Sequence, residues 1–253
     1  MHVHPSLREP ALLLAFDGWN DAGEAATSAA RFVSDALACV PLAELDPEEF
    51  YDFTVRRPCV RQGADHVRRI EWPASEFRFG AIDPMRDVVI GIAAEPHLRW
   101  RRYCDLVLGL VATLRIRRTV LLGAYLADVV YSRPVGVTGF ASSERELARL
   151  TVQPSGYEGP TGIVGVLADR LQAEGVEVVS LWAGLPHYIT ASPNPRGALA
   201  LVKKITECLA FRVDESPLVK EAAEFEERIA ALVAADPELS DYVRELKRRE
   251  FAQ

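Results

Sequence analysis

The sequence Gly-Tyr-Glu-Gly-Pro-Thr-Gly-Ile at residues 156–163, followed by Leu-Trp-Ala-Gly-Leu-Pro-His-Tyr at 181–188, decides how this chain folds. The glycines of the first stretch permit a tight turn, and Pro160 and Thr161 are residues that begin a helix. Apolar residues then recur at helical spacing up to Gly175, which we expect to end that helix. The apolar run 176–185 has the length and composition of a strand. A loop, a helix, a strand and a second loop in this order predict half of a parallel α/β unit.

Further strands are predicted in the part of the chain that precedes this stretch. Continuous apolar runs at 11–16, 87–94 and 120–125 are typical of strands covered on both faces. Between residues 40 and 82 the segments are shorter, and one of them alternates apolar and charged residues as a half-exposed antiparallel strand does. We therefore expect an α/β fold of three layers, in which helices cover both faces of a mixed, mostly parallel sheet.

Capping residues mark several helix starts. Asp21 is placed to cap a helix over residues 22–37, and Asn194 with Pro195 begins a helix that runs to about residue 209. Ser143 and Glu146 have the spacing of a capping box for a short helix.

The last forty or so residues have a different pattern. Segments 217–235 and 237–251 show helical periodicity, with acids near each start and, in the second segment, basic residues near its end. The sequence thus predicts a C-terminal αα-hairpin at residues 213–253, appended to an α/β domain at 1–212. Its apolar face is suited either to its own domain or to a neighbouring subunit.

Composition excludes several classes of function. With 253 residues and 49% hydrophobic content, the chain can bury one substantial core. The formal net charge of -7 disfavours nucleic acid as a partner. No apolar run approaches the length of a membrane span, and no secretory signal region opens the chain, so we expect a soluble, cytoplasmic protein. The four cysteines lack the spacing of a zinc site or a redox pair, and we expect them to be reduced.

Polar and aromatic side chains gather in the loops that follow the predicted strands. Because the carboxyl ends of parallel strands share one edge of a sheet, we expect these loops to meet there and to form a binding site. The candidate binding residues are Asp17, Trp19, Asn20, Asp21, Glu95, Tyr157, Gly159, Thr161, Gly162, His187 and Asn194.

The same residues permit a catalytic interpretation and a structural one. His187 is placed to act as a general base with Glu95, Tyr157 or Asp17 if the loops meet, or simply to orient its own turn by a hydrogen bond. The turn at 159–162 is placed to hold a phosphate at a helix start, although it lacks the lysine of a P-loop. The sequence contains no nucleophile elbow and no complete metal-ligand set, so no catalytic residue, metal or cofactor is assigned.

Several motifs taken together resemble the proteasome assembly chaperone family, in its single-chain prokaryotic branch. These motifs are Phe-Asp-Gly-Trp-Asn-Asp-Ala-Gly at 16–23, Glu-Pro at 95–96, the two stretches quoted above, and Pro-Asn-Pro at 193–195. The resemblance covers residues 10–210. It implies a phosphorylase/hydrolase-like fold, homo-oligomers, and binding of proteasome α-subunits without chemistry.

Two segments depart from the pattern of that family. Relatives often read Pro-His-Thr-Arg-Pro where this chain has Val-Tyr-Ser-Arg-Pro at 130–134. Relatives that dock on the proteasome through their tail end in a hydrophobic residue, tyrosine and any residue, whereas this sequence reads Phe251, Ala252 and Gln253. We expect the last helix to be structural.

The leading hypothesis is therefore a non-catalytic, homo-oligomeric, assembly chaperone-like protein with proteasome α-subunits as a candidate partner. The alternative is a small-molecule or nucleotide-dependent enzyme that uses the loops around Asp17, Glu95, Gly159 and His187.

Overall fold

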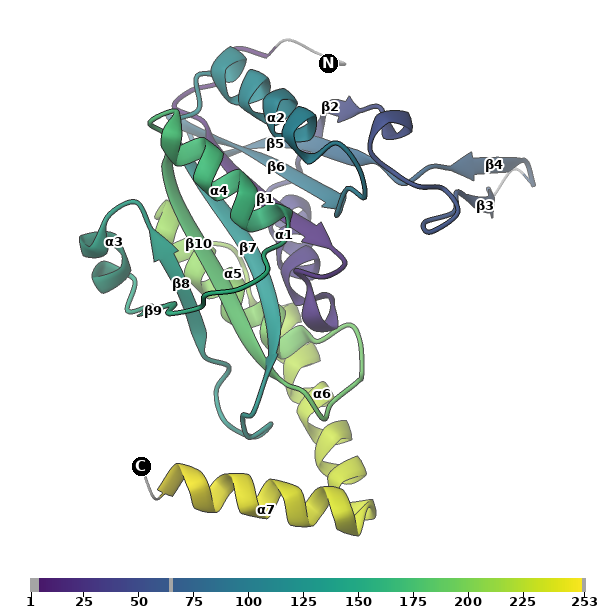
Figure 1. Cartoon of the computed structure of the whole chain (residues 1–253), viewed down its shortest axis with the longest axis vertical. Coiled ribbons are helices and arrows are strands. Elements are labelled where there is room, and N and C mark those ends of the chain that lie inside the picture. Colours follow the sequence, from purple (N-terminus) through teal and green to yellow (C-terminus); the bar gives the residue numbers. More distant parts are fainter. Residues whose placement is uncertain (1–4, 64–65, 252–253) are drawn as a thin grey trace.

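A mixed sheet of eight strands forms the centre of the molecule, in the order β2-β5-β6-β1-β7-β10-β8-β9 (Figure 1). The structure is a computed structural model that describes residues 5–63 and 66–251. The strands of the sheet are β1 (Ala11–Asp17), β2 (Val40–Leu45), β5 (Ser75–Asp83), β6 (Arg86–Ala94), β7 (Arg118–Ala127), β8 (Val137–Ala141), β9 (Gln153–Pro154) and β10 (Glu177–Pro186). The helices are α1 (Ala25–Ala36), α2 (Trp100–Leu114), α3 (Glu144–Arg149), α4 (Ile163–Ala173), α5 (Pro195–Leu209), α6 (Ser216–Ala235) and α7 (Pro237–Phe251).

The middle of the sheet is parallel. Strand β1 lies between β6 and β7 and is parallel to both, so that Leu13 is paired with Ile90 on one side and with Val120 on the other. Strand β10 continues the parallel set beyond β7. Antiparallel strands flank this centre, with β5 and β2 on one side and β8 on the other. The mixed, mostly parallel sheet predicted from the apolar runs is thus confirmed.

Helices cover both faces of the sheet, because successive strand residues point to opposite sides. Leu13 of β1 packs into the core that α1 and α5 cover, whereas its neighbours Leu12 and Leu14 pack into the core that α2 and α4 cover. All three side chains are almost completely buried, as the continuous apolar run indicated. The three-layer arrangement is confirmed.

One predicted cap is wrong. The side chain of Ser143 makes no capping hydrogen bond at the start of α3. Glu146, its expected partner, instead forms ion pairs with Arg149 at 2.8 Å and with Arg118 of β7 at 3.2 Å. A carboxylate next to two guanidinium groups is drawn to them rather than to a backbone N–H, because the hydrogen bonds to a charged donor are stronger.

Both C-terminal helices form, and they pack against their own chain. Helix α6 lies along α5, and Leu218 joins the core beneath it. Helix α7 then turns off at a wide angle and runs past the loops that follow β7 and β10 (Figure 1). Val243 and Leu246 of α7 are buried there against Val130 and against Phe225 of α6. Residues 252–253 lie outside the described residues.

Strands β3 (Cys59–Gln62) and β4 (Arg68–Glu71) form a separate two-stranded sheet, with Val60 paired with Ile70. Figure 1 shows this hairpin projecting from the body of the molecule. We call residues 58–72 the arm.

The four cysteines form no disulfide, and Cys39, Cys104 and Cys208 are buried. Within residues 5–63 and 66–251, no helix has the length and apolar character that crossing a membrane demands.

Candidate functional site

A crevice opens between the carboxyl ends of β1 and β6. The segment after β1 leads to α1 on one face of the sheet, and the segment after β6 leads to α2 on the opposite face. Ligands of open α/β sheets bind at such points, where the chain departs in opposite directions from neighbouring parallel strands. The crevice has a volume of about 350 Å³ and is lined by Asp17, Gly18, Trp19, Arg56, Glu95, Pro96, His97 and Trp100.

The segment after β1 is shaped by a turn that leaves the sheet and returns to it. Gly18 adopts a φ of +117°, and its carbonyl accepts the N–H of Asp21 at 3.1 Å. The chain is then back beside β7, where the N–H of Ala124 donates to the carbonyl of Asn20 at 2.8 Å. The turn leaves Trp19 at its tip with 60% of its surface exposed.

Glu95 joins three of the predicted loops. Its Oε1 atom accepts the amide of Asn20 at 2.7 Å and the backbone N–H of Ile163, the first residue of α4, at 2.8 Å. Gly162 leaves the space for this contact, because a Cβ atom there would lie 2.2 Å from Oδ1 of Asn20 and 2.6 Å from Oε1 of Glu95. Asn20, Glu95 and Gly162 are therefore brought together as the loop pattern predicted.

The same contact bears on the phosphate interpretation of the turn at 159–162. Unpaired N–H groups and the helix dipole make the start of α4 attractive to an anion. That position holds the carboxylate of Glu95, which satisfies the N–H of Ile163. A bound phosphate would meet this negative charge at close range.

Asp17 forms an ion pair with Arg56, a residue that the sequence did not indicate as part of the site. Its Oδ2 atom accepts from Nη2 of Arg56 at 2.5 Å. Arg56 is held by a turn in which its N–H donates to the carbonyl of Asp52 at 2.9 Å. His97 ties this turn to the segment after β6, since its Nδ1 atom accepts the N–H of Asp52 at 3.0 Å.

Asp21 and Asn194 serve helix starts. The carboxylate of Asp21 is buried and accepts the N–H of Ala26 at 2.6 Å and the hydroxyl of Thr27 at 2.5 Å. Burial raises the pKa of this carboxyl to about 6, although these hydrogen bonds act in the opposite direction. Asn194 accepts the N–H of Gly197 at 3.0 Å and so caps α5.

The loop that precedes α4 is closed by its own residues. The hydroxyl of Tyr157 donates to the carbonyl of Pro160 at 2.8 Å, and the ring is 65% exposed. It lies over Gly159, where a Cβ atom would come within 2.8 Å of the Tyr157 hydroxyl. Thr161 packs against Gly165 in the first turn of α4.

Comparison with known proteins identifies the family of this chain. The family model described as the PAC2 family matches residues 15–233. The chain belongs to the PAC2 family.

Three solved structures illustrate this relationship. The proteasome-assembly chaperone homologue Rv2125 of Mycobacterium tuberculosis is 38% identical, with 92% of this chain and 99% of that chain covered and a TM-score of 0.83. A PAC2 family protein of Streptomyces avermitilis is 36% identical over the same shares, with a TM-score of 0.85. PbaB of Pyrococcus furiosus, an archaeal proteasome activator, is 18% identical over 91% of this chain and 96% of that chain, with a TM-score of 0.72, and shows the shared fold alone. No curated protein matches the chain.

His187 of this PAC2 protein does not lie at the crevice. Strands β7 and β10 continue to the pair Ala127 and Pro186, three residues past the level of Ala124 at which the β1 loop rejoins the sheet. β10 is also two strands away from β1, which separates them by about 10 Å across the sheet. His187 thus follows a strand end at the same carboxyl edge of the sheet as the other loops, but it lies outside the crevice because β7 and β10 extend further than β1 and β6.

The surroundings of His187 are aromatic and belong partly to α7. Its Nδ1 atom lies 3.0 Å from Oδ1 of Asp128, and its ring packs edge-on against those of Tyr188 and Tyr242. These rings help to hold α7 on the loops after β7 and β10. His187 thus lies in a packing contact between the C-terminal helix and the body.

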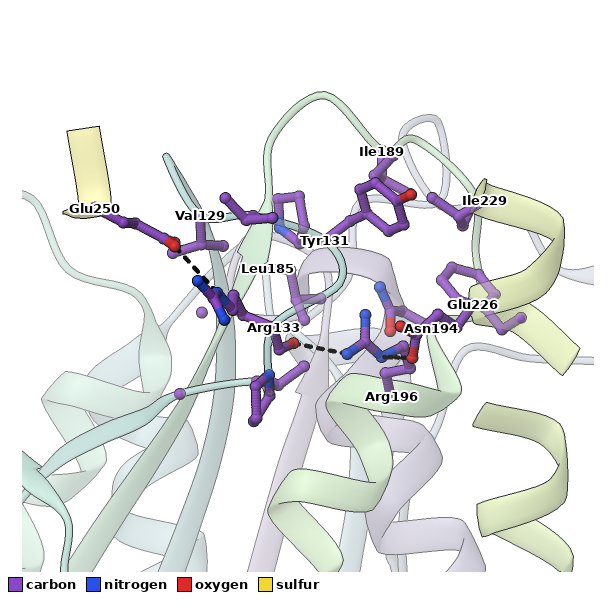
Figure 2. Close-up of a pocket in the computed structure, with 17 residues that line it drawn as sticks. Val129, Tyr131, Arg133, Leu185, Ile189, Asn194, Arg196, Glu226, Ile229 and Glu250 are labelled. Atoms are coloured by element: carbon purple, nitrogen blue, oxygen red, sulfur yellow. Dashed lines mark hydrogen bonds and ion pairs between the residues drawn. The ribbon is translucent and has the colours of Figure 1, made fainter. Parts of the chain in front are cut away.

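A second cavity of the PAC2 protein, of about 210 Å³, lies beside this contact (Figure 2). Figure 2 shows Arg133 reaching Glu250 of α7, with 3.2 Å between Nε and Oε2. Arg196 reaches from the start of α5 to the carbonyl of Arg133 at 2.6 Å and to Glu226 of α6 at 3.5 Å. The segment 130–134, which departs from the family pattern, therefore carries a residue that joins α5 to α7.

Sequence reasoning missed Arg56, His97 and Trp100 as residues of the crevice. Arg56 lies in a segment with no strand or helix pattern, and it reaches Asp17 across 39 residues of sequence. His97 followed Glu95 and Pro96 directly, and its place at a strand end was a signal that could have found it. Among the described residues, no group of three or more histidine, cysteine or acidic side chains is placed to hold a metal ion.

Proposed function

We propose that this protein binds another protein without catalysing a reaction, as an assembly chaperone-like member of the PAC2 family, with proteasome α-subunits as its partner. The observation that carries this proposal is the 38% identity, over 92% of this chain, to a protein described as a proteasome-assembly chaperone homologue. The match of the PAC2 family model to residues 15–233 covers all of the sheet except the first residues of β1.

The arm supports a protein partner. Every residue of β3 and β4 is exposed, including the facing pair Val60 at 48% and Ile70 at 54%. Trp72, at the foot of the arm, is 48% exposed. A hairpin of two strands is only marginally stable in water, and apolar side chains gathered on a projecting element are typical of interaction surfaces.

The charge of the arm indicates what kind of surface it fits. The arm has the arginines 61, 68 and 69 against the acids 65 and 71, and the arginines 56 and 57 directly precede it, although the whole chain carries a net charge of -7. A partner surface that complements the arm is acidic and has apolar side chains at its centre. This charge pattern also supports self-association, because the acidic remainder of a second copy attracts the arm, and we propose a homo-oligomer in the cytoplasm.

The partner is tested with purified proteasome α-subunits. We expect immobilised α-subunits to capture the wild-type chain, and the double variant Val60→Lys with Ile70→Lys to bind at least tenfold more weakly, since two buried apolar contacts are lost. Val219→Lys, at a residue of α6 that is 45% exposed, is the matched control and should bind within twofold of wild type.

Two results would contradict this account in different ways. If the wild-type chain fails to bind α-subunits at low salt, the proposed partner is wrong. If it binds and the arm variant binds equally well, the partner is right and the arm is not the contact. Light scattering after size exclusion, at low and high salt, tests the homo-oligomer, which should dissociate as salt screens the arm.

A further inference from the structure

The crevice at the ends of β1 and β6 contains a distinctive set of groups. Two carboxylates, Asp17 and Glu95, and two indoles, Trp19 and Trp100, lie around one cavity. Carboxylates attract cations, and indole faces attract flat cations in particular. The lining therefore favours a cationic group over an anionic or a purely apolar one.

Arg56 already occupies part of this cavity and shows which cation fits. Its guanidinium group reaches Oδ2 of Asp17 at 2.5 Å. The side chains of Arg56 and Asp17 are 42% and 35% exposed, so water screens the pair. A pair of this kind contributes little to stability, which makes Arg56 exchangeable for a second guanidinium.

Glu95 leaves one oxygen for a ligand. Oε1 is engaged by Asn20 and by the N–H of Ile163, whereas Oε2 accepts no hydrogen bond from any residue that the structure describes. The contacts at Oε1 hold the carboxylate in place, so that Oε2 is preorganised and costs no side-chain ordering when a ligand binds.

The indoles complete the cavity. The N–H of Trp100 donates to the carbonyl of Pro96 at 2.5 Å, which fixes the plane of that ring. Trp19 stands at the rim with most of its surface in water. A large aromatic side chain held in water at a turn gains free energy when a ligand covers it.

We propose that the crevice binds the guanidinium group of an arginine side chain presented by a protein partner, and that this group replaces Arg56 on Asp17. The identity of the source as a partner protein rests on the function proposed above, whereas the preference for guanidinium rests on the crevice alone. Guanidinium is favoured over the ammonium of lysine because it is planar, stacks on indoles and can bridge two carboxylates.

The test uses a small probe, N-acetyl-arginine amide, which presents an arginine side chain as a protein does. Its binding is followed by NMR through the indole N–H signals of Trp19 and Trp100. We expect a dissociation constant of about 1–10 mM for the wild-type chain, and no binding of N-acetyl-citrulline amide, which has the same shape without the charge.

Variants separate the crevice from general surface charge. Arg56→Gln removes the internal competitor and should bind the probe several-fold more tightly, while Asp17→Asn should bind it at least fivefold more weakly. Arg57→Gln removes an exposed neighbouring charge and should match the wild type within twofold. Neither Asp17 nor Arg56 is buried, so thermal melts of these variants should stay close to that of wild type.

Each outcome decides the proposal. Equal binding of the arginine and citrulline probes, no tightening in Arg56→Gln, or no binding at all overturns it. Binding of free L-arginine but not of the capped probe also overturns it, since the site then serves a small molecule. If the chain binds the probe but not the α-subunits, the crevice assignment holds and only the proposed partner is wrong. If it binds the α-subunits but not the probe, the proposed partner holds and the crevice assignment is wrong.

Discussion

Glu95 and Ile163 are joined by a hydrogen bond of 2.8 Å between the carboxylate Oε1 atom and the backbone N–H. The bond ties the end of β6 to the start of α4 across 68 residues of sequence. Since the carboxylate lies at the positive end of the helix dipole, the contact combines a charge-assisted hydrogen bond with a favourable charge–dipole interaction.

Removing this carboxylate should destabilise the fold. We expect Glu95→Ala to lower the free energy of unfolding by about 1–3 kcal/mol, because the N–H of Ile163 and the amide of Asn20 lose their acceptor. Glu95→Gln keeps an acceptor without the charge and should cost only about 0.3–1 kcal/mol. Urea denaturation measures both, with the exposed Glu158→Ala as control. Equal stability of Glu95→Ala and wild type would show that the contact contributes nothing.

Adding a side chain at Gly162 should destabilise the fold. Its φ of -87° suits any residue, so the expected effect of Gly162→Ala comes only from the contacts of the new Cβ atom with Asn20 and Glu95. Overpacking of this kind costs about 1–3 kcal/mol. At Gly156, no atom of the described residues lies within 4 Å of an added Cβ, and Gly156→Ala should change the free energy of unfolding by less than about 0.5 kcal/mol. Similar thermal melts for the two variants would contradict the packing described here.

Asp21 should make stability depend on pH. Its pKa in the folded state, about 6, lies above the ordinary value of 3.8, because burial disfavours the charged form. The folded state therefore binds more protons between these values, and the stability that protonated Asp21 contributes is complete below about pH 4 and lost as pH rises through 6. The shift of about two units corresponds to about 3 kcal/mol.

The variant Asp21→Asn isolates this effect, since an amide does not titrate. The free energy of unfolding of wild type relative to Asp21→Asn should fall as pH rises from 4 to 7, by up to about 3 kcal/mol. Thr27→Val removes the hydroxyl that favours the ionised form and should extend the fall to higher pH. Parallel pH profiles of wild type and Asp21→Asn in urea denaturation would refute the assignment.

Leu246 should hold α7 on the body of the molecule. It is 5% exposed within the cluster that Val243 of α7 forms with α6 and Val130. A helix of 15 residues is marginal in water by itself, so Leu246→Asp should release and unfold α7 and leave the sheet intact. Hydrogen exchange of amides 237–251 should accelerate at least tenfold, while the exposed control Arg248→Gln, which adds no negative charge at the end of the helix, leaves it nearly unchanged. Unchanged protection in Leu246→Asp would mean that other contacts hold the helix.

The elements that the sequence predicted depend on neighbours close along the chain. The run 11–16 in β1 is apolar at every position, a pattern typical of a strand covered on both faces. Asn194 caps α5 through Gly197, three residues away, and Gly175 ends α4 with a φ of +77°. Such contacts are fixed by residue type and spacing alone, and for this reason the strands, most of the helix starts and the loops at the strand ends could be predicted.

The composition of the crevice, in contrast, was decided by the tertiary structure. Arg56 meets Asp17 across 39 residues and Glu95 meets Ile163 across 68, whereas His187 is kept away because β7 and β10 run three residues further than the returning β1 loop. Apolar periodicity states that a strand is buried, but not which strands become its neighbours, how far each extends or which helix start faces which loop. Those relationships follow only when the whole chain packs, because the hydrophobic effect that drives packing is non-directional and leaves the pairing of distant polar groups to the final arrangement of the layers.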